Sequence, residues 1–217
     1  MDTGEHIALF GPTGRVGREV MQRALAAGHR VTAVARTPAK VTVTHQHLEV
    51  LAADATRPEQ VLAAIKQSAG GTAGLTAVVM AVGSDPLKAS SVVSDSVRAI
   101  VAAMTQLGVG RYIGVSGTAN MPTRTVRARL SLVPVRRFIK AAADHATAYE
   151  IVRTSGLDYV LAGCPYIRDG APAARYKEEV GPFPGGFKVI TPAEVADFLV
   201  RQIADRRYHR QIVGIWH

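Results

Sequence analysis

The chain has 217 residues, of which 47% are hydrophobic, so it can bury a substantial core as one domain. Its 26 lysines and arginines outnumber 17 acidic residues and give a formal net charge of +9. The single cysteine, Cys164, excludes an internal disulfide and a multi-thiolate metal site, and we expect no metal. No apolar run reaches the roughly 18–20 residues of a membrane span, and the N-terminus does not resemble a secretory signal. We therefore expect one cytoplasmic domain over residues 1–217 with no membrane partner.

Strand and helix patterns alternate along the chain. Short apolar or β-branched runs predict strands over residues 6–10, 30–35, 48–52, 75–82, 111–115, 157–161 and 211–216. Amphipathic spacing predicts helices over residues 14–27, 58–68, 91–107 and 138–155, and a capped helix that opens at Thr191–Glu194. This order is typical of right-handed βαβ units. It predicts an α/β fold with a Rossmann-type, doubly wound, mostly parallel sheet in a three-layer αβα arrangement.

Two irregular stretches interrupt the alternation, at about residues 117–137 and 168–188. Both follow the carboxyl ends of late strands, which is where ligands bind in open α/β sheets. Long loops in a compact domain are usually functional or mobile. We therefore interpret both stretches as substrate-side loops.

The turn between the first strand and the first helix reads Gly11-Pro-Thr-Gly14-Arg-Val-Gly17. Gly11 allows a tight turn, Gly14 lets a pyrophosphate approach the backbone, and Gly17 lets the helix pack on the sheet. The helix N-terminus then offers free N–H groups and a positive dipole to phosphate. This position in the chain favours a dinucleotide site over an ordinary tight βα turn.

The end of the second strand indicates which dinucleotide binds. An NAD-binding fold usually has an acidic residue there, which holds the ribose 2′-hydroxyl. Here the strand ends at Arg36, Lys40 follows, and no acidic residue lies between Glu19 and Glu49. Two cations suit a 2′-phosphate, so NADP(H) is preferred over NAD(H). The alternative is a solvated basic loop.

Two later strand ends carry weaker signals. Asp54 follows the third strand, where its side chain could reach the adenine or serve as a turn residue before Pro58. Gly83 ends the fourth strand, where it could let the backbone pass close to a ribose or simply terminate the strand.

These residues in this order resemble the atypical short-chain dehydrogenase/reductases. The likeness is strongest to the NAD(P)H-binding group that includes NADPH-dependent flavin reductases of the biliverdin reductase B type, and NmrA-like proteins are more distant. It runs from Ile7 to about Val200. Its markers are Phe10–Gly17, Val34–Arg36, Ala53-Asp54, Val82-Gly83, Arg98–Val101, Asp144-His145, Ser155–Val160, Pro165–Ile167 and Thr191–Asp197.

The resemblance implies that NADP(H) lies along the carboxyl edge of the sheet. The implied cofactor contacts are Gly11, Thr13, Gly14, Arg15, Val16 and Gly17 for the pyrophosphate, Arg36 and Lys40 for the 2′-phosphate, Asp54 and Ala55 for the adenine, Val82 and Gly83 for the ribose, and Val115, Ser116, His145, Pro165, Tyr166 and Ile167 around the nicotinamide. The flavin reductases have histidine at the position of Tyr166, and this difference leaves the identity of the acceptor open.

The usual catalytic pair of short-chain dehydrogenases, Tyr-x-x-x-Lys, is absent. The nearest pattern is Tyr149 with Arg153, which fits a structural contact better. In the family register the two positions are Ala141 and His145. Alcohol oxidation by the usual proton exchange is therefore disfavoured. Hydride transfer to an easily reduced conjugated acceptor (a flavin, a quinone or a linear tetrapyrrole) needs less help from the protein.

Three side chains are candidate catalytic residues. Ser116 could donate a hydrogen bond to the acceptor or the nicotinamide, or be a turn serine. His145 could hold the nicotinamide ribose or relay a proton, or lie on a helix surface. Tyr166 could stack on the substrate or donate to it, or lie at the edge of the core. We interpret Cys164 as a small buried hydrophobic residue.

A basic stretch follows the fifth strand and contains Arg124, Arg127, Arg129, Arg136, Arg137 and Lys140. In the family this segment lies beside the substrate, so it could steer an anionic acceptor. It could equally be a solvated loop or a contact with a partner protein. Few aromatic residues interleave with it and no DNA-binding motif is present, so nucleic acid is disfavoured.

Together these patterns predict an NADPH-dependent reductase, as a monomer or homodimer, that passes hydride to a small, conjugated and anionic acceptor. The alternative is an NmrA-like sensor that binds NADP(H) without turnover.

Overall fold

The computed structural model describes residues 4–68, 74–85, 87–134, 139, 141–173 and 175–217. Its main sheet has eight strands in the order β3-β2-β1-β4-β5-β6-β10-β8. The strands are β1 (His6–Phe10), β2 (Arg30–Ala35), β3 (Leu48–Ala52), β4 (Leu75–Met80), β5 (Arg111–Gly117), β6 (Asp158–Cys164), β8 (Lys177–Val180) and β10 (Gln211–Trp216). Every pairing is parallel except that of β8 with β10, so the predicted mostly parallel sheet is confirmed.

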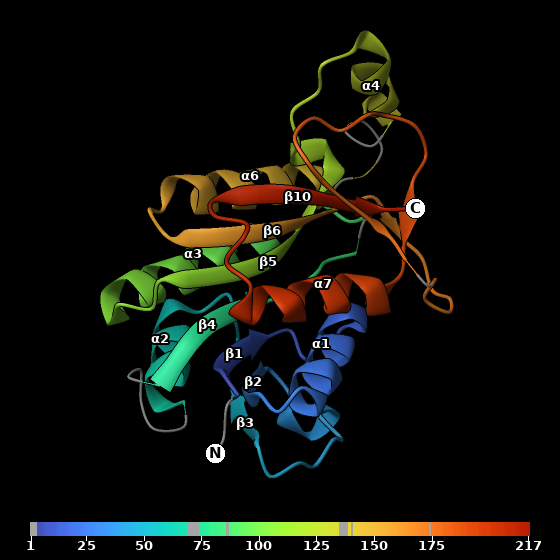
Figure 1. The fold of residues 1–217 in the computed structure, drawn as a ribbon. Helices are drawn as coiled ribbons and strands as arrows, with labels where there is room; N and C mark the ends of the chain where they lie inside the picture. Colours follow the sequence, from blue (N-terminus) through green and yellow to red (C-terminus); the bar gives the residue numbers. More distant parts are fainter. Residues whose placement is uncertain (1–3, 69–73, 86, 135–138, 140, 174) are drawn as a thin grey trace.

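Helices cover both faces of this sheet (Figure 1). One layer holds α1 (Arg15–Ala26) and α7 (Pro192–Ala204), and the other holds α2 (Pro58–Gln67), α3 (Val92–Leu107) and α6 (Ala141–Thr154). Along β1, Ile7 and Leu9 belong to the core beneath α1 and α7, whereas Ala8 and Phe10 belong to the core on the opposite face. All five residues of β1 are buried, as expected for a strand covered on both sides. The three-layer αβα arrangement is therefore confirmed.

The strand order reverses between β1 and β4, since the chain runs from β1 outward to β3 and then returns to β4. Ligands of open α/β sheets bind outside the carboxyl ends of the strands at such a switch point. The glycine turn follows β1 directly. The topology thus places this turn at the expected crevice.

The two stretches expected to be irregular contain regular elements, which corrects that prediction. The first holds a 3-10 turn (Thr118–Asn120) and α4 (Val126–Ser131), whose N-cap Thr125 accepts a hydrogen bond from the Ala128 amide at 3.0 Å. The second holds β7 (Tyr166–Ile167), β8 and β9 (Val189–Ile190). β7 and β9 form a separate parallel pair.

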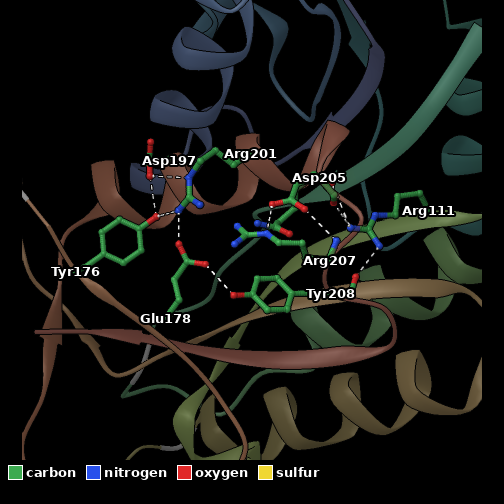
Figure 2. Close-up of polar contacts among 9 residues, drawn as sticks. Arg111, Tyr176, Glu178, Asp197, Arg201, Asp205, Arg207 and Tyr208 are labelled. Atoms are coloured by element: carbon green, nitrogen blue, oxygen red, sulfur yellow. Dashed lines mark hydrogen bonds and ion pairs between the residues drawn. The ribbon is translucent and has the colours of Figure 1, made fainter.

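The sequence does not predict β8, because its residues, Lys-Glu-Glu-Val, lack the apolar alternation of a strand. Charged residues are common on edge strands, where they discourage pairing with other chains. Here they also form specific contacts. Arg201 of α7 donates to Glu178 at 2.6 Å, and the Tyr208 hydroxyl donates to the same carboxylate at 3.0 Å (Figure 2).

Helix ends follow the sequence closely where caps are present. The predicted opening of α7 is a complete capping box between Thr191 and Glu194. Gly108 ends α3 in the left-handed conformation, with φ of +72°. The helix expected over residues 138–155 is α6, described from Ala141, and residues 138 and 140 lie outside the described part. Among the helices described, none combines the length and apolarity needed to cross a membrane.

Candidate functional site

Gly11 and Gly17 of the glycine turn are required by the fold itself. Gly11 has φ of +82°, and a Cβ there would lie 2.8 Å from the backbone of Ala81. A Cβ on Gly17 would lie 1.9 Å from the Gly11 carbonyl oxygen. Either side chain would force the backbone apart. These two glycines therefore let α1 begin close against the end of β1.

Gly14 differs, because the protein leaves room beside it. Its backbone is extended, with φ of −74°, and a Cβ there would come no closer than 3.4 Å to protein atoms. Gly14 is also the N-cap of α1, which has no side-chain cap and no acidic residue in its first turn. The first amides of α1 and its positive dipole end thus lie beside an exposed glycine, an arrangement that suits a phosphate group.

Arg15 connects the glycine turn to the segment after β6. Its guanidinium forms an ion pair with Asp169 at 3.0 Å and donates to the Ile167 carbonyl at 3.4 Å. The structure therefore brings the predicted residues of β7 next to the start of α1. Beside them lies an open polar cavity of about 370 Å³, lined by Arg15, Arg18, Glu19, Gln22, Asp169, Gly170, Pro192 and Ala193.

Arg36 and Lys40 both lie exposed after the end of β2. Within the part of the chain that the structure describes, neither forms an ion pair. Both remain open to a ligand. Arg36 lies near enough to Asp54 to contribute to the lowered pKa of that carboxyl, although the largest contribution is the hydrogen bond from the Thr56 backbone.

Asp54 has a local structural role at the end of β3. Its Oδ1 accepts from the Thr56 amide at 3.0 Å and from the Thr56 hydroxyl at 2.8 Å, which makes an Asx turn. This is the turn interpretation that the sequence allowed, and contact with an adenine stays a prediction. Of the remaining predicted contacts, Gly83 is exposed, and Thr13, Val16, Ala55, Val82, Val115 and Pro165 are partly buried.

Ser116 and His145 come together at the carboxyl end of β5. Both line one small internal cavity of about 10 Å³, roughly the size of one water molecule. Asn120 links them, since its Nδ2 donates to Ser116 Oγ at 3.0 Å and to the His145 carbonyl at 3.1 Å. Because Ser116 Oγ is the acceptor, its own proton is available to donate.

His145 is partly buried, which corrects the alternative of a histidine on a helix surface. Burial lowers its pKa below the ordinary histidine value, and the neighbouring Asp144 opposes this shift only in part. The imidazole is therefore neutral at pH 7. Asp144 itself caps α3, since its carboxylate accepts from the Val93 and Ser94 amides at 2.9 Å each. This bond fixes the turn of α6 that carries His145.

Tyr149 lies one helical turn beyond His145 and lines the same cavity. Arg153 forms an ion pair with Glu150 at 2.6 Å, and Tyr149 contributes a smaller electrostatic interaction with it. Cys164 is buried, and burial raises the pKa of its thiol, so it packs as a hydrophobic residue as expected.

Tyr166 lies on the surface with a side chain 63% exposed, which corrects the alternative of a tyrosine at the core edge. Its ring faces that of Phe187 at a centroid distance of 6.4 Å.

The basic stretch is described in part. Arg124, Arg127 and Arg129 are all exposed, on or just before α4. Arg136, Arg137 and Lys140 lie outside the described residues. Across the described ranges, no cluster of three or more His, Cys, Asp or Glu side chains could hold a metal ion.

Sequence reasoning missed two residues of this region, Asn120 and Phe187. Asn120 lies four residues after Ser116, and a 3-10 turn that the sequence did not indicate brings its amide back to the serine. Phe187 lies in a segment rich in glycine and proline, where an isolated aromatic residue carries no periodic signal.

Comparisons with known proteins agree with this geometry. A family model described as NAD(P)H-binding matches residues 11–206. A candidate exported protein from Burkholderia pseudomallei is 25% identical with a TM-score of 0.79, and the match covers 98% of this chain and 100% of that one. A candidate NADH-flavin reductase from Streptococcus pneumoniae is 20% identical with a TM-score of 0.78, over 99% and 100% of the two chains.

A short-chain dehydrogenase/reductase from Veillonella parvula, solved in complex with NADP, is 16% identical with a TM-score of 0.73. That match covers 98% of this chain and 94% of the other. At such identity the likeness shows the fold, whereas the family model covers most of the chain. The protein therefore belongs to the NAD(P)H-binding family and has its Rossmann-type fold.

Proposed function

We propose that this protein is an NADPH-dependent reductase that delivers hydride to a planar, conjugated and anionic acceptor such as a flavin, a quinone or a linear tetrapyrrole. One observation carries the proposal. The exposed glycine Gly14 follows β1, and the neighbouring strand β2 ends where Arg36 and Lys40 are exposed and where the sequence has no acidic residue between Glu19 and Glu49. The pattern fits a dinucleotide with a 2′-phosphate better than one with a free 2′-hydroxyl.

The residues present fit this cofactor. The amides at the start of α1 would hold the pyrophosphate, and the lack of a Cβ on Gly14 would leave its path clear. Arg36 and Lys40 would bind the 2′-phosphate. The exposed backbone at Gly83 would lie along a ribose. When bound, NADPH supplies the hydride, which is chemistry that amino-acid side chains lack.

Ser116 and His145 would orient the reacting groups and handle the proton. Asn120 donates to Ser116 Oγ, so the serine hydroxyl can donate toward the nicotinamide or the acceptor. Burial favours the neutral form of His145, so the imidazole can relay a proton by accepting one at one ring nitrogen while it gives up the proton on the other. A conjugated acceptor spreads the charge it receives with the hydride. The missing tyrosine–lysine pair is therefore compatible with turnover.

Charge near the acceptor side supports an anionic substrate. The exposed Arg124, Arg127 and Arg129 form a cationic surface on and before α4. Such a surface raises the encounter rate of anions, an effect that weakens with added salt. FMN should accordingly react faster than riboflavin at low ionic strength, because only FMN carries a phosphate.

The test is NADPH oxidation, followed by loss of its absorbance, with FMN, riboflavin, a quinone and biliverdin offered separately and NADH run in parallel. We expect acceptor-dependent oxidation that is faster with NADPH. Ser116→Ala should lower kcat by a larger factor than it raises the Kd for NADPH, because most of the cofactor contacts lie elsewhere. Tight NADPH binding with no turnover on any acceptor would instead favour an NmrA-like cofactor sensor.

A further inference from the structure

Two aromatic rings stand exposed together on the acceptor side of the molecule. Phe187 is 84% exposed, the largest fraction for any large hydrophobic residue that the structure describes, and Tyr166 is 63% exposed. Their ring centroids lie 6.4 Å apart with planes inclined by 30°. Paired exposed rings offer flat apolar area that nothing in the described chain covers, and such area marks binding surfaces.

The position of this pair is fixed by two contacts. Tyr166 pairs with Val189 in the β7–β9 ladder, and Phe187 precedes Val189 by two residues. The next residue on β7, Ile167, accepts a hydrogen bond from Arg15 of the glycine turn through its carbonyl oxygen. The rings therefore lie near the start of α1, where the cofactor would bind.

The segment that leads to Phe187 packs against a helix that carries exposed cationic side chains. Gly185 packs so tightly on α4 that a Cβ there would lie 2.8 Å from Ala128 Cα. Arg127 and Arg129, on either side of Ala128, are both exposed. Figure 1 shows α4 projecting at the top of the view, next to the segment that follows β8. A flat apolar surface on a segment that packs against a cationic helix suits a planar ring system that carries negative charge.

We propose that Phe187 and Tyr166 form an aromatic platform on which the fused rings of a flavin stack, and that Phe187 sets the preference for multi-ring acceptors over single-ring quinones. The proposal rests on the reductase function proposed above and names its acceptor class. A fused three-ring system overlaps an aromatic side chain more fully than one ring does. Measured energies of aromatic pairs correspond to about 3- to 10-fold in affinity.

The experiment compares the wild type with Phe187→Ala, Phe187→Leu and Phe187→Trp, using FMN, riboflavin and a one-ring benzoquinone. Phe187→Ala and Phe187→Leu should raise the KM for both flavins by about 3- to 10-fold, with little change for benzoquinone. Phe187→Trp should retain the wild-type KM because it keeps a ring. The matched control is Val180→Ala, which removes another exposed apolar side chain (52% exposed) on the edge strand β8.

Three results would overturn the platform. They are an unchanged flavin KM in Phe187→Ala, an equal rise in Val180→Ala, and a wild-type dimer that becomes monomeric in Phe187→Ala. The last result would make Phe187 a subunit contact.

Quenching of flavin fluorescence measures flavin binding without turnover. It therefore tests the platform independently of the reductase function. Flavin binding that depends on Phe187 without NADPH oxidation would refute the reductase and support the platform. Turnover that is indifferent to Phe187 would support the reductase and refute the platform.

Discussion

Cationic side chains have different environments at the two ends of the parallel strands. At the amino ends of β5 and β6, Arg111 is only 3% exposed and forms an ion pair with Asp158 at 2.7 Å. Its guanidinium also donates to the carbonyls of Tyr208, Gln202 and Asp205 at 3.1–3.2 Å (Figure 2). At the carboxyl end of β2, Arg36 and Lys40 are exposed and form no ion pair within the described ranges.

The difference distinguishes a cation that holds the fold from cations that have no ion-pair partner within the described ranges. Arg111 has protein partners along most of its guanidinium, so it joins β5, β6 and the end of α7 into one unit. Arg201 does the same at the sheet's outer edge, with Tyr176, Glu178 and Asp197 (Figure 2). Clustered charge alone therefore does not indicate a site.

Removing the amino-end cation should strongly reduce stability. Arg111→Met leaves the Asp158 carboxylate with only His209 and Arg206 as partners, and it removes the Arg111 donors to three backbone carbonyls. We expect a loss of about 3–5 kcal/mol in the free energy of unfolding, measured by urea denaturation. Arg36→Ala, the matched control at the carboxyl end, should leave the free energy of unfolding within about 0.5 kcal/mol of wild type. Comparable losses in both variants would contradict the comparison.

Two glycines of the same turn, Gly14 and Gly17, should respond differently to substitution. Gly17→Ala should unfold or strongly destabilise the chain, because its Cβ would lie 1.9 Å from the Gly11 carbonyl oxygen. Gly14→Val should fold, since the protein leaves space there, but should weaken NADPH binding by at least about 10-fold by entering the pyrophosphate path. Thermal unfolding and fluorescence titration measure the two effects. Undiminished NADPH affinity in folded Gly14→Val would disprove the assigned role of the turn.

Charge reversal at the end of β2 should change cofactor choice. Arg36→Asp replaces a donor to the 2′-phosphate by a repelling carboxylate, which could accept from a 2′-hydroxyl instead. NADPH affinity should fall by about 10- to 100-fold while NADH affinity changes little. Paired titrations of the two nucleotides measure the ratio directly. Equal losses for both would place the 2′-phosphate elsewhere.

The smallest expected effect is the pH dependence from His145. Its pKa is lowered in the folded protein by burial, so below about pH 6.5 the unfolded chain takes up a proton that the folded chain resists. Stability should therefore be fully present at pH 7.5 or so and fall toward about pH 5.5. His145→Gln should reduce this slope in the melting temperature. It should not abolish it, because His6 and His29 also have lowered pKa values. An unchanged slope would mean that His145 titrates normally.

The sequence predicts this fold well where local and global signals agree. β1, the glycine turn and α1 could be predicted because an apolar run, three spaced glycines and an amphipathic helix follow one another directly. The cap of α7 could be predicted because its signal is entirely local. Two parts of the site depend on contacts distant in sequence. The Asp144 cap on α3 spans about 50 residues, and the Tyr166–Phe187 pair depends on the short β7–β9 ladder.

The most direct test of the account is a crystal structure of the protein with NADPH. We predict the pyrophosphate within hydrogen-bond distance of the first amides of α1, its path crossing the face of Gly14, and the 2′-phosphate between the side chains of Arg36 and Lys40. A nucleotide bound away from the glycine turn, or a 2′-phosphate that points into solvent while both cations stay free, would contradict it.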